Sequence, residues 1–248
     1  MSSAPFQFKQ FAIQQDRSAA KIGTDGVLLG AWTSLEHHPN SILDIGTGTG
    51  VIALMLAQRS ASQTIDALEL DEDAYEQATE NFEASDWGDR LFCYHAHLYE
   101  FATEMDEQYD LIVSNPPFYE PEYKTQNKAR DQARFDDAMP FELLLGAVQN
   151  LLSPDGRFNV ILPFHREQEF IQLAERGGLL PTRITQVQGT PTSEVKRSMM
   201  EFCFREPASP AGRSLTTPAT IETLIIEKSR HDYTEEYVAL VKDFYLKM

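Results

Sequence analysis

The chain has 248 residues, 42% of them hydrophobic, and carries 38 acidic against 21 basic side chains, a formal net charge of −17. This length suits one α/β domain, and the composition excludes a chain that is disordered throughout. The acidic balance argues against a simple polyanion-binding protein, because nucleic-acid-binding proteins usually present a basic surface.

Membrane, secretory, disulfide and metal features are not expected. The longest apolar stretch, Val51 to Ala57, is far too short to span a bilayer, and the first residues lack the pattern of a secretory signal. The two cysteines, Cys93 and Cys203, fall in strand-like runs, which favours buried reduced thiols. The six histidines and two cysteines lack metal-ligand spacing. We therefore expect a soluble, cytoplasmic protein with no metal and no obligate protein partner.

Strand-like and helix-like segments alternate along the chain. Strands are predicted at 41–46, 64–70, 91–98, 109–116, 157–163, 182–188 and 199–206. Helices are predicted at 51–59, 71–85, 139–152 and 166–178. This alternation predicts an α/β fold, a mostly parallel sheet with helices on both faces. The Pro- and Ser-rich segment 205–220 is expected to form an exposed loop.

A glycine-rich loop follows the first predicted strand. Asp44 closes the strand, and Gly46, Gly48 and Gly50 follow at alternating positions before a helix opens. Glycines allow a tight turn and let the backbone approach a ligand. Glu69 ends the next strand, where a carboxylate can accept hydrogen bonds from both ribose hydroxyls. These features predict a nucleotide site; the alternative is a glycine turn of no special purpose, with Glu69 a solvated strand end.

The loop spacing distinguishes between nucleotide cofactors. A dinucleotide fingerprint is G-x-G-x-x-G, whereas this loop reads D-x-G-x-G-x-G. An acid beside the loop disfavours a pyrophosphate and suits a cationic ligand. S-adenosylmethionine carries a sulfonium and an ammonium and no phosphate, so the loop favours it over NAD. An NAD-dependent oxidoreductase and a nucleotide-binding module without catalysis remain alternatives.

The segment DLIVSNPPFYEP, residues 110–121, ends the fourth predicted strand abruptly. Proline cannot donate to a sheet ladder, and each residue before a proline is pushed to an extended geometry, which stiffens Asn115 and Pro116. The result is a rigid loop with a carboxamide, a fixed carbonyl and a ring at a strand's carboxyl end, where ligands bind in open α/β sheets. The alternative is a strand-terminating turn with Phe118 as a core plug.

Together the two motifs resemble those of class I S-adenosylmethionine-dependent methyltransferases. LDIGTGTG with Glu69 is similar to their cofactor loop, and NPPF is similar to their N/D-P-P-Y/F signature for methylating amino nitrogens on planar groups. The segments 8–32, 115–121 and 231–246 resemble the family of tRNA-Val adenine N6-methyltransferases, which modify the adenine at tRNA position 37. The match covers nearly the whole chain.

The resemblance implies a Rossmann-like class I methyltransferase fold with a seven-stranded, mostly parallel sheet, in a single domain of residues 1–248. Residues 1–35 are expected to form a lid and helix over the cofactor. The implied reaction is methylation of the N6 amine of adenine 37 in tRNA-Val. N5-methylation of a glutamine in a protein, and amino methylation of rRNA or DNA, are the alternatives.

The resemblance also assigns site residues. The catalytic set is Asn115, Pro116, Pro117 and Phe118. If the Asn115 side-chain oxygen and the Pro116 carbonyl each accept one N–H of the adenine amine, its lone pair can face the methyl donor, while Phe118 stacks on the splayed or flipped base. The implied S-adenosylmethionine-binding set is Lys21, Gly23, Thr24, Asp25, Asp44, Gly46, Thr47, Gly48, Gly50, Glu69, Leu70 and His97.

Two assignments keep alternatives. Thr24 or Asp25 can instead cap a helix beginning at Gly26. His97 stands where relatives commonly have an acid that meets the cofactor's adenine, so it either takes over that contact or the contact is absent. Beside the Asn-Pro-Pro-Phe turn, four cations are predicted to contact RNA phosphates, or else to form a solvated helix face. They are Lys124, Lys128, Arg130 and Arg134.

Overall fold

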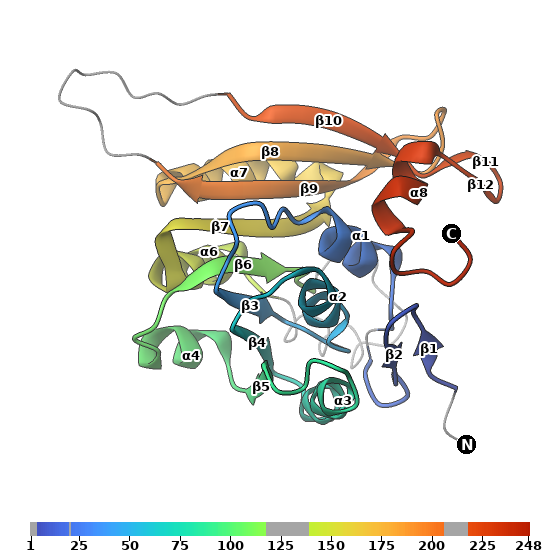
Figure 1. Cartoon of the computed structure of the whole chain (residues 1–248). Helices are drawn as coiled ribbons and strands as arrows, with labels where there is room; N and C mark the ends of the chain where they lie inside the picture. Colours follow the sequence, from blue (N-terminus) through green and yellow to red (C-terminus); the bar gives the residue numbers. More distant parts are fainter. Residues whose placement is uncertain (1–3, 20, 118–138, 206–217) are drawn as a thin grey trace, which may run out of the picture.

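The structure, a computed structural model, describes residues 4–19, 21–117, 139–205 and 218–248. An eight-stranded sheet with helices on both faces forms its body (Figure 1). In spatial order its strands are β10 (Thr220–Ile225), β8 (Leu179–Gln188), β9 (Val195–Phe204), β7 (Leu152–Pro163), β6 (Tyr109–Ser114), β3 (Ser41–Ile45), β4 (Thr64–Glu69) and β5 (Leu91–His95). The helices are α1 (Thr24–Trp32), α2 (Val51–Arg59), α3 (Glu72–Glu83), α4 (Leu98–Glu104), α6 (Phe141–Leu151), α7 (Glu167–Arg176) and α8 (Glu235–Val241), with the 3₁₀ helix η1 (Phe164–Arg166). Two small antiparallel pairs are β1 (Phe6–Gln7) with β2 (Ala12–Ile13), and β11 (Glu227–Ser229) with β12 (Asp232–Tyr233).

Strand direction confirms the predicted mostly parallel sheet. Only β9 among these eight strands is antiparallel to its neighbours, β7 and β8, and every other pairing is parallel. Seven strands therefore end at one edge of the sheet, and β9 begins there. In open α/β sheets, ligands bind at this carboxyl edge.

Alternating side chains divide the interior into two cores. On β3, Ile42 packs in the core beneath α1 and α2, whereas Leu43 packs in the core beneath α6. Successive residues of a strand point to opposite faces, so a strand buried on both faces is apolar throughout. This explains why the central strands read as continuous apolar runs in the sequence.

The sheet has one strand more than the seven predicted. The additional strand, β10, pairs parallel with β8 at the sheet edge, so Thr220 begins a strand and does not end a loop. Only Leu224 in β10 is buried, which left no apolar alternation for the sequence to reveal. The rest of the predicted 205–220 loop, apart from Arg205 and residues 218–219, lies outside the described residues.

Several element boundaries also differ from the prediction, since β7, β8 and β9 begin three to five residues earlier than predicted. Helix α1 begins at Thr24 with Gly23 as its N-cap and without a side-chain capping bond, so neither Thr24 nor Asp25 caps a helix at Gly26. Strand β5 ends at His95, because His97 caps the unpredicted helix α4, its Nδ1 accepting from the Tyr99 amide at 3.2 Å. Local capping bonds of this kind end a strand that apolar content alone would extend.

The predicted absences can be compared only with the described part of the chain. Cys93 and Cys203 are not joined by a disulfide, and both are only partly buried. Within the described residues, no helix is long and apolar enough to cross a membrane. No group of three potential metal ligands gathers within those same ranges.

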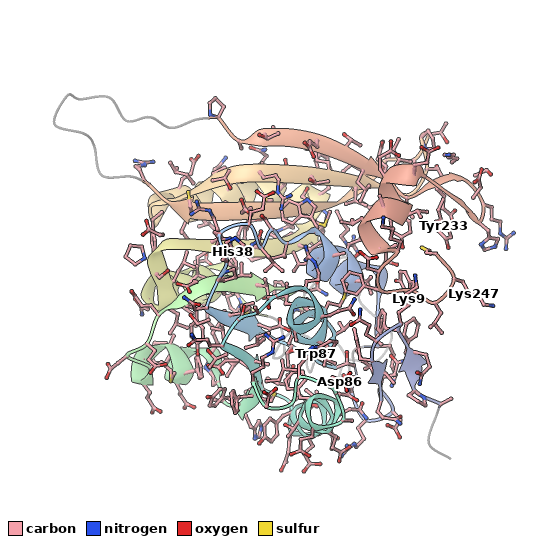
Figure 2. All side chains as sticks on the ribbon, viewed as in Figure 1. Lys9, His38, Asp86, Trp87, Tyr233 and Lys247 are labelled. Carbon is pink, nitrogen blue, oxygen red and sulfur yellow. The ribbon has the colours of Figure 1, made fainter. Side chains whose placement is uncertain are left out.

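The N-terminal segment packs against the C-terminal one. Phe8 forms an antiparallel bridge with Tyr245, and the Lys9 amide donates to the Phe244 carbonyl at 2.8 Å. The Lys9 ammonium donates to the Lys242 carbonyl at 2.5 Å, across 233 positions of sequence. Figure 2 shows Lys9 beside the C-terminal segment that carries Lys247. These contacts fix the start of the segment that leads into α1.

Candidate active site

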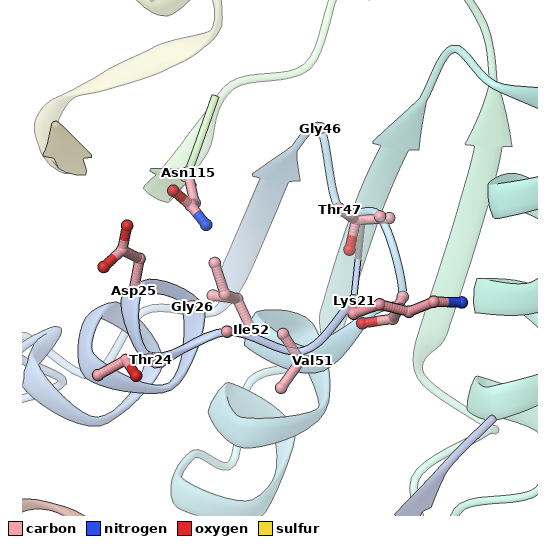
Figure 3. Close-up of a pocket in the computed structure, with 12 residues that line it drawn as sticks. Lys21, Thr24, Asp25, Gly26, Gly46, Thr47, Val51, Ile52 and Asn115 are labelled. Atoms are coloured by element: carbon pink, nitrogen blue, oxygen red, sulfur yellow. The ribbon is translucent and has the colours of Figure 1, made fainter. Parts of the chain in front are cut away.

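A pocket of about 390 Å³ lies at the carboxyl edge of the sheet (Figure 3). The loop after β3, the residues before and at the start of α1, and the end of β6 together form it. Its lining residues are Lys21, Gly23, Thr24, Asp25, Gly26, Gly46, Thr47, Gly48, Thr49, Val51, Ile52 and Asn115. Most of the predicted cofactor residues are thus brought together with the predicted catalytic asparagine. Gly26, Thr49, Val51 and Ile52 were not predicted.

The three loop glycines adopt the left-handed backbone that glycine favours. Gly46, Gly48 and Gly50 have φ angles of 72°, 58° and 82°. A Cβ on Gly50 would also lie 2.5 Å from the Phe82 ring of α3. The loop thereby turns tightly from β3 into α2, and its glycines let the backbone approach a ligand between the lining residues Thr47 and Thr49.

Asp44 is a fully buried carboxylate beneath this loop. Its Oδ2 accepts from the Thr47 hydroxyl at 2.7 Å and from the Ala53 amide at 3.2 Å. Its Oδ1 accepts no hydrogen bond from the described residues. Burial raises the pKa of Asp44 to about 7, against the two hydrogen bonds, which favour the charged form. An unpartnered buried oxygen of this kind suits a cationic ligand nearby.

Glu69 ties the end of β4 to the glycine loop. One carboxylate oxygen accepts from the Gly48 amide at 2.8 Å, and the other accepts from the amides of Leu70 at 2.8 Å and Asp71 at 3.0 Å. The oxygen that accepts only from Gly48 can take a further bond, so the carboxylate is fixed in place and still able to bind a hydroxyl. Leu70, directly after it, is 53% exposed.

Buried amides on α3 hold the segment that leads to the pocket. Asn81 accepts from the Gln14 amide at 2.8 Å and donates to the carbonyls of Gln14 at 2.9 Å and Thr49 at 3.0 Å. Gln77 accepts from the amides of Arg17 at 3.1 Å and Ser18 at 3.0 Å. Asn81 therefore couples the N-terminal segment to the glycine loop.

These two residues were missed by the sequence analysis. Asn81 and Gln77 are almost fully buried and four positions apart on one helix face. Polar residues at buried helical positions were the available signal, since buried polar groups require partners.

Asn115 enters the pocket at the end of β6. The preceding Ser114 hydroxyl donates to the Ile45 carbonyl at 2.8 Å, which fixes β6 to β3 at this point. A Cβ on Gly26 would lie 3.9 Å from the Asn115 amide nitrogen, so α1 closes on it from the other side. Pro116 is buried and Pro117 is exposed. Phe118 and the four predicted RNA-binding cations, Lys124, Lys128, Arg130 and Arg134, lie outside the described residues.

An ion pair stands beside Asn115 that the sequence did not reveal. The Arg197 Nε of β9 donates to the Asp25 carboxylate of α1 at 2.7 Å. Figure 3 shows the Asp25 carboxylate on the same side of the pocket as Asn115. Five predicted cofactor residues are outside the pocket lining, and one of them, His97, is used as a helix cap; the five are Asp44, Gly50, Glu69, Leu70 and His97.

The pocket fits S-adenosylmethionine on three observations. Its volume lies in the range of small-molecule sites. The loop offers a glycine backbone, and Asp44, buried beneath the loop and outside the pocket lining, has an oxygen with remaining acceptor capacity. A parallel sheet with this loop and an asparagine at the next central strand end defines a Rossmann-like class I methyltransferase.

Comparison with known proteins agrees with this class. A predicted O-methyltransferase of Agrobacterium tumefaciens superposes with a TM-score of 0.66 at 18% identity, covering 89% of this chain and 96% of that one, which supports the fold alone. Residues 22–171 match the methyltransferase small domain family.

The full-length relatives are closer. The tRNA1(Val) (adenine(37)-N6)-methyltransferase of Christiangramia forsetii is 56% identical, with all of both chains covered. The protein of the same name from Flavobacterium johnsoniae is 58% identical over 98% of this chain and all of its own. That of Proteus mirabilis is 40% identical over 97% of this chain and 93% of its own. The chain belongs to the tRNA1(Val) (adenine(37)-N6)-methyltransferase family.

Proposed function

We propose that this protein transfers a methyl group from S-adenosylmethionine to N6 of adenine 37 in tRNA1(Val). The observation that carries the proposal is the position of Asn115, which lines one pocket with the glycine loop at the end of β6. Family membership supports the substrate, since relatives at 56% and 58% identity carry that activity in their names.

Different groups of the chain would bind different parts of the methyl donor, S-adenosylmethionine. S-adenosylmethionine, when bound, supplies an electrophilic methyl group on a sulfonium. Glu69 would accept from the ribose hydroxyls, while the backbone of Gly46 to Gly50 would approach the ligand closely. Asp44 and the residues before α1 would face its cationic methionine end, where the unpartnered Asp44 oxygen offsets positive charge.

The end of β6 would hold the methyl acceptor. The exocyclic amine of adenine is a weak nucleophile with two N–H donors. The Asn115 side-chain oxygen and the Pro116 carbonyl would accept one each, which fixes the nitrogen and directs its lone pair toward the methyl group. Both acceptors also stabilise the positive charge that the nitrogen gains, so the chain needs no strong base for the transfer. We further propose that Phe118 stacks on the base.

The test is methylation of unmodified tRNA1(Val) transcript by the purified full chain. Mass spectrometry of nuclease fragments should locate one N6-methyladenine at position 37, and a transcript with guanosine at that position should not react. Asn115→Ala should lower kcat by about 10²–10³, the cost of losing one such contact. Its dissociation constant for S-adenosylmethionine should stay near that of the wild type.

Two outcomes would contradict this assignment. Labelling of total protein but not of tRNA would favour glutamine methylation. A kcat for Asn115→Ala within threefold of the wild type would remove Asn115 from its role. The cytoplasmic location and the lack of an obligate protein partner stay predictions, which fractionation and sizing of the native protein would check.

A further inference from the structure

Three segments of the second half of the chain share the carboxyl edge with the pocket. They are η1 after β7, the β8–β9 connection with the first residues of β9 (189–197), and the segment after β10 (226–231). Pro163 pairs with Arg197, which places η1 beside the start of β9. The Glu227 amide donates to the Gly189 carbonyl at 2.9 Å, which joins the other two segments. Figure 1 shows β8 and β10 ending where β9 begins.

These segments are basic on a strongly acidic protein. They carry five cations against two acids, whereas the chain as a whole has a net charge of −17. The cations are Arg166, Lys196, Arg197, Lys228 and Arg230, and the acids are Glu194 and Glu227. The segment 118–138 beside the Asn-Pro-Pro-Phe turn, by comparison, has four cations and five acids in its sequence.

Some of these cations are paired and some are not. Arg166 pairs with Glu169, and Lys228 lies 3.6 Å from Glu235. Lys196 and Arg230 are exposed and form no ion pair with any residue in the described ranges. Exposed cations without acidic partners are available to an anionic ligand.

Arg197 connects this surface to the reacting centre. Its Nε donates to Asp25, which lines the pocket with Asn115, and its Nη1 donates to the Lys196 carbonyl at 3.1 Å. Its Nη2 donates no hydrogen bond to the described part of the chain, and the side chain is 35% exposed. An arginine held at one end by a carboxylate keeps its planar fork oriented, which suits contact with a phosphate.

We propose that Lys196, Arg197 and Arg230 form the surface that binds the RNA backbone next to the target adenine. Arg197 contacts the phosphate nearest the flipped nucleotide while Asn115 holds its base, and Lys196 and Arg230 contact flanking phosphates. This inference rests on the proposed function. It locates RNA binding on β9 and the segment after β10, and it explains how a protein of such negative charge admits RNA at one edge.

The first test measures tRNA1(Val) affinity across a salt series. Each lost phosphate contact removes roughly 0.7 to 0.9 from the log–log salt slope, so Lys196→Gln/Arg230→Gln should lose roughly 1.4 to 1.8. The matched control is Arg157→Gln/Arg176→Gln, which removes two positive charges at the opposite edge of the sheet. Arg157 lies on β7, paired with Leu111 near the start of β6, and Arg176 ends α7. Its slope should stay within 0.3 or so of the wild type. S-adenosylmethionine affinity should be unchanged in both.

The second test separates a phosphate contact from support of Asp25. Losing a hydrogen bond to a charged group costs about 1.5 to 3 kcal/mol, so Arg197→Gln should raise KM for tRNA about 10- to 100-fold. Arg197→Lys keeps the positive charge but not the planar fork, so its KM for tRNA should lie between those of the wild type and Arg197→Gln. If Arg197→Gln weakens S-adenosylmethionine binding by the same factor by which it raises KM for tRNA, Arg197 acts only by supporting Asp25. The proposed phosphate contact would then be wrong.

The outcomes also separate this surface from the proposed function. If the wild type methylates position 37 but has the same salt slope as Lys196→Gln/Arg230→Gln, the proposed RNA-binding surface is wrong and the proposed function stands. A wild type that neither binds nor methylates tRNA overturns both.

Discussion

The two halves of the carboxyl edge are built in opposite ways. Around β3 and β4, polar groups are bonded to backbone: the buried Asp44 accepts from Ala53, and the half-buried Glu69 accepts from Gly48. Around β9 and β10, charges such as Lys196 and Arg230 stand on exposed segments. The first arrangement suits a small ligand that must be held rigidly, and the second suits a large polyanion. Substitutions in the first half should therefore lower the stability of the fold. Substitutions in the second half should lower the affinity for tRNA, by an amount that depends on salt concentration.

The largest effect is expected at Gly50. An alanine there would adopt a left-handed backbone, which costs about 1–2 kcal/mol, and would press on Phe82, which costs about 1–3 kcal/mol more. We expect Gly50→Ala to lower the free energy of unfolding by about 2–5 kcal/mol, measured by urea denaturation. Gly146→Ala is the control, because nothing lies within 4 Å of a Cβ on Gly146 of α6. Unchanged stability in Gly50→Ala would contradict the tight approach of the loop to α3.

Asn81→Ala comes next. It leaves the Gln14 amide and the carbonyls of Gln14 and Thr49 without their partner, at a cost of about 2–3 kcal/mol. Because Asn81 joins the N-terminal segment to the glycine loop, S-adenosylmethionine affinity should fall several-fold as well, measured by calorimetry. The exposed Glu83→Ala on the same helix should change neither quantity. Lost stability with intact cofactor affinity would show that this coupling does not reach the pocket.

Asp44 should give a smaller effect that depends on pH. Its pKa is raised from an ordinary 3.8 to about 7, so the folded protein keeps a proton that the unfolded chain releases. Its contribution to stability is therefore full below pH 4 or so and is lost as the pH rises through about 7. The advantage of the wild type over Asp44→Asn should shrink by about 2 kcal/mol or less between pH 5 and pH 7.5. Urea denaturation without cofactor measures it, with exposed Asp86→Asn as the control. An advantage that stays flat, or grows with pH, would contradict the raised pKa.

The smallest effect on stability is expected for Arg230→Gln. Surface substitutions of this kind usually stay within about 0.5 kcal/mol. Its tRNA affinity at low salt should nevertheless fall, and the difference from the wild type should narrow as salt rises. A stability loss comparable to that of Asn81→Ala would remove the contrast between the two halves.

The same contrast describes what the sequence revealed. Helix α2 and the central strands were predicted closely, because Val51 to Arg59 and the apolar runs encode their own structure. The glycine loop and Asn115 were found because tight turns and strand ends demand particular residues. Strand β10 was missed because an edge strand with one buried side chain needs no apolar pattern.

Polar contacts between residues far apart in the chain could not be predicted from the sequence. Arg197 lies 172 positions from Asp25, and no local rule pairs them. Asn81 lies 67 positions from Gln14, and only its burial within α3 hinted at a role. Such partners are brought together only by the tertiary fold. Spacing along the chain identifies only partners that lie within a single turn of each other in sequence.

The contact between the two ends of the chain also imposes an order of events during synthesis. Lys9 is made before its partner Lys242, which follows 233 residues later. The sheet of β3 to β6 and its glycine loop can form before then, but the segment that carries Lys21 and Asp25 to the pocket lacks its final anchor. Contacts of such sequence separation form slowly. The glycine loop and the bonds of Gln14, Arg17 and Ser18 to α3 can thus form before Lys242 is made, and the contact between Lys9 and Lys242 is added afterwards as the last anchor of this segment.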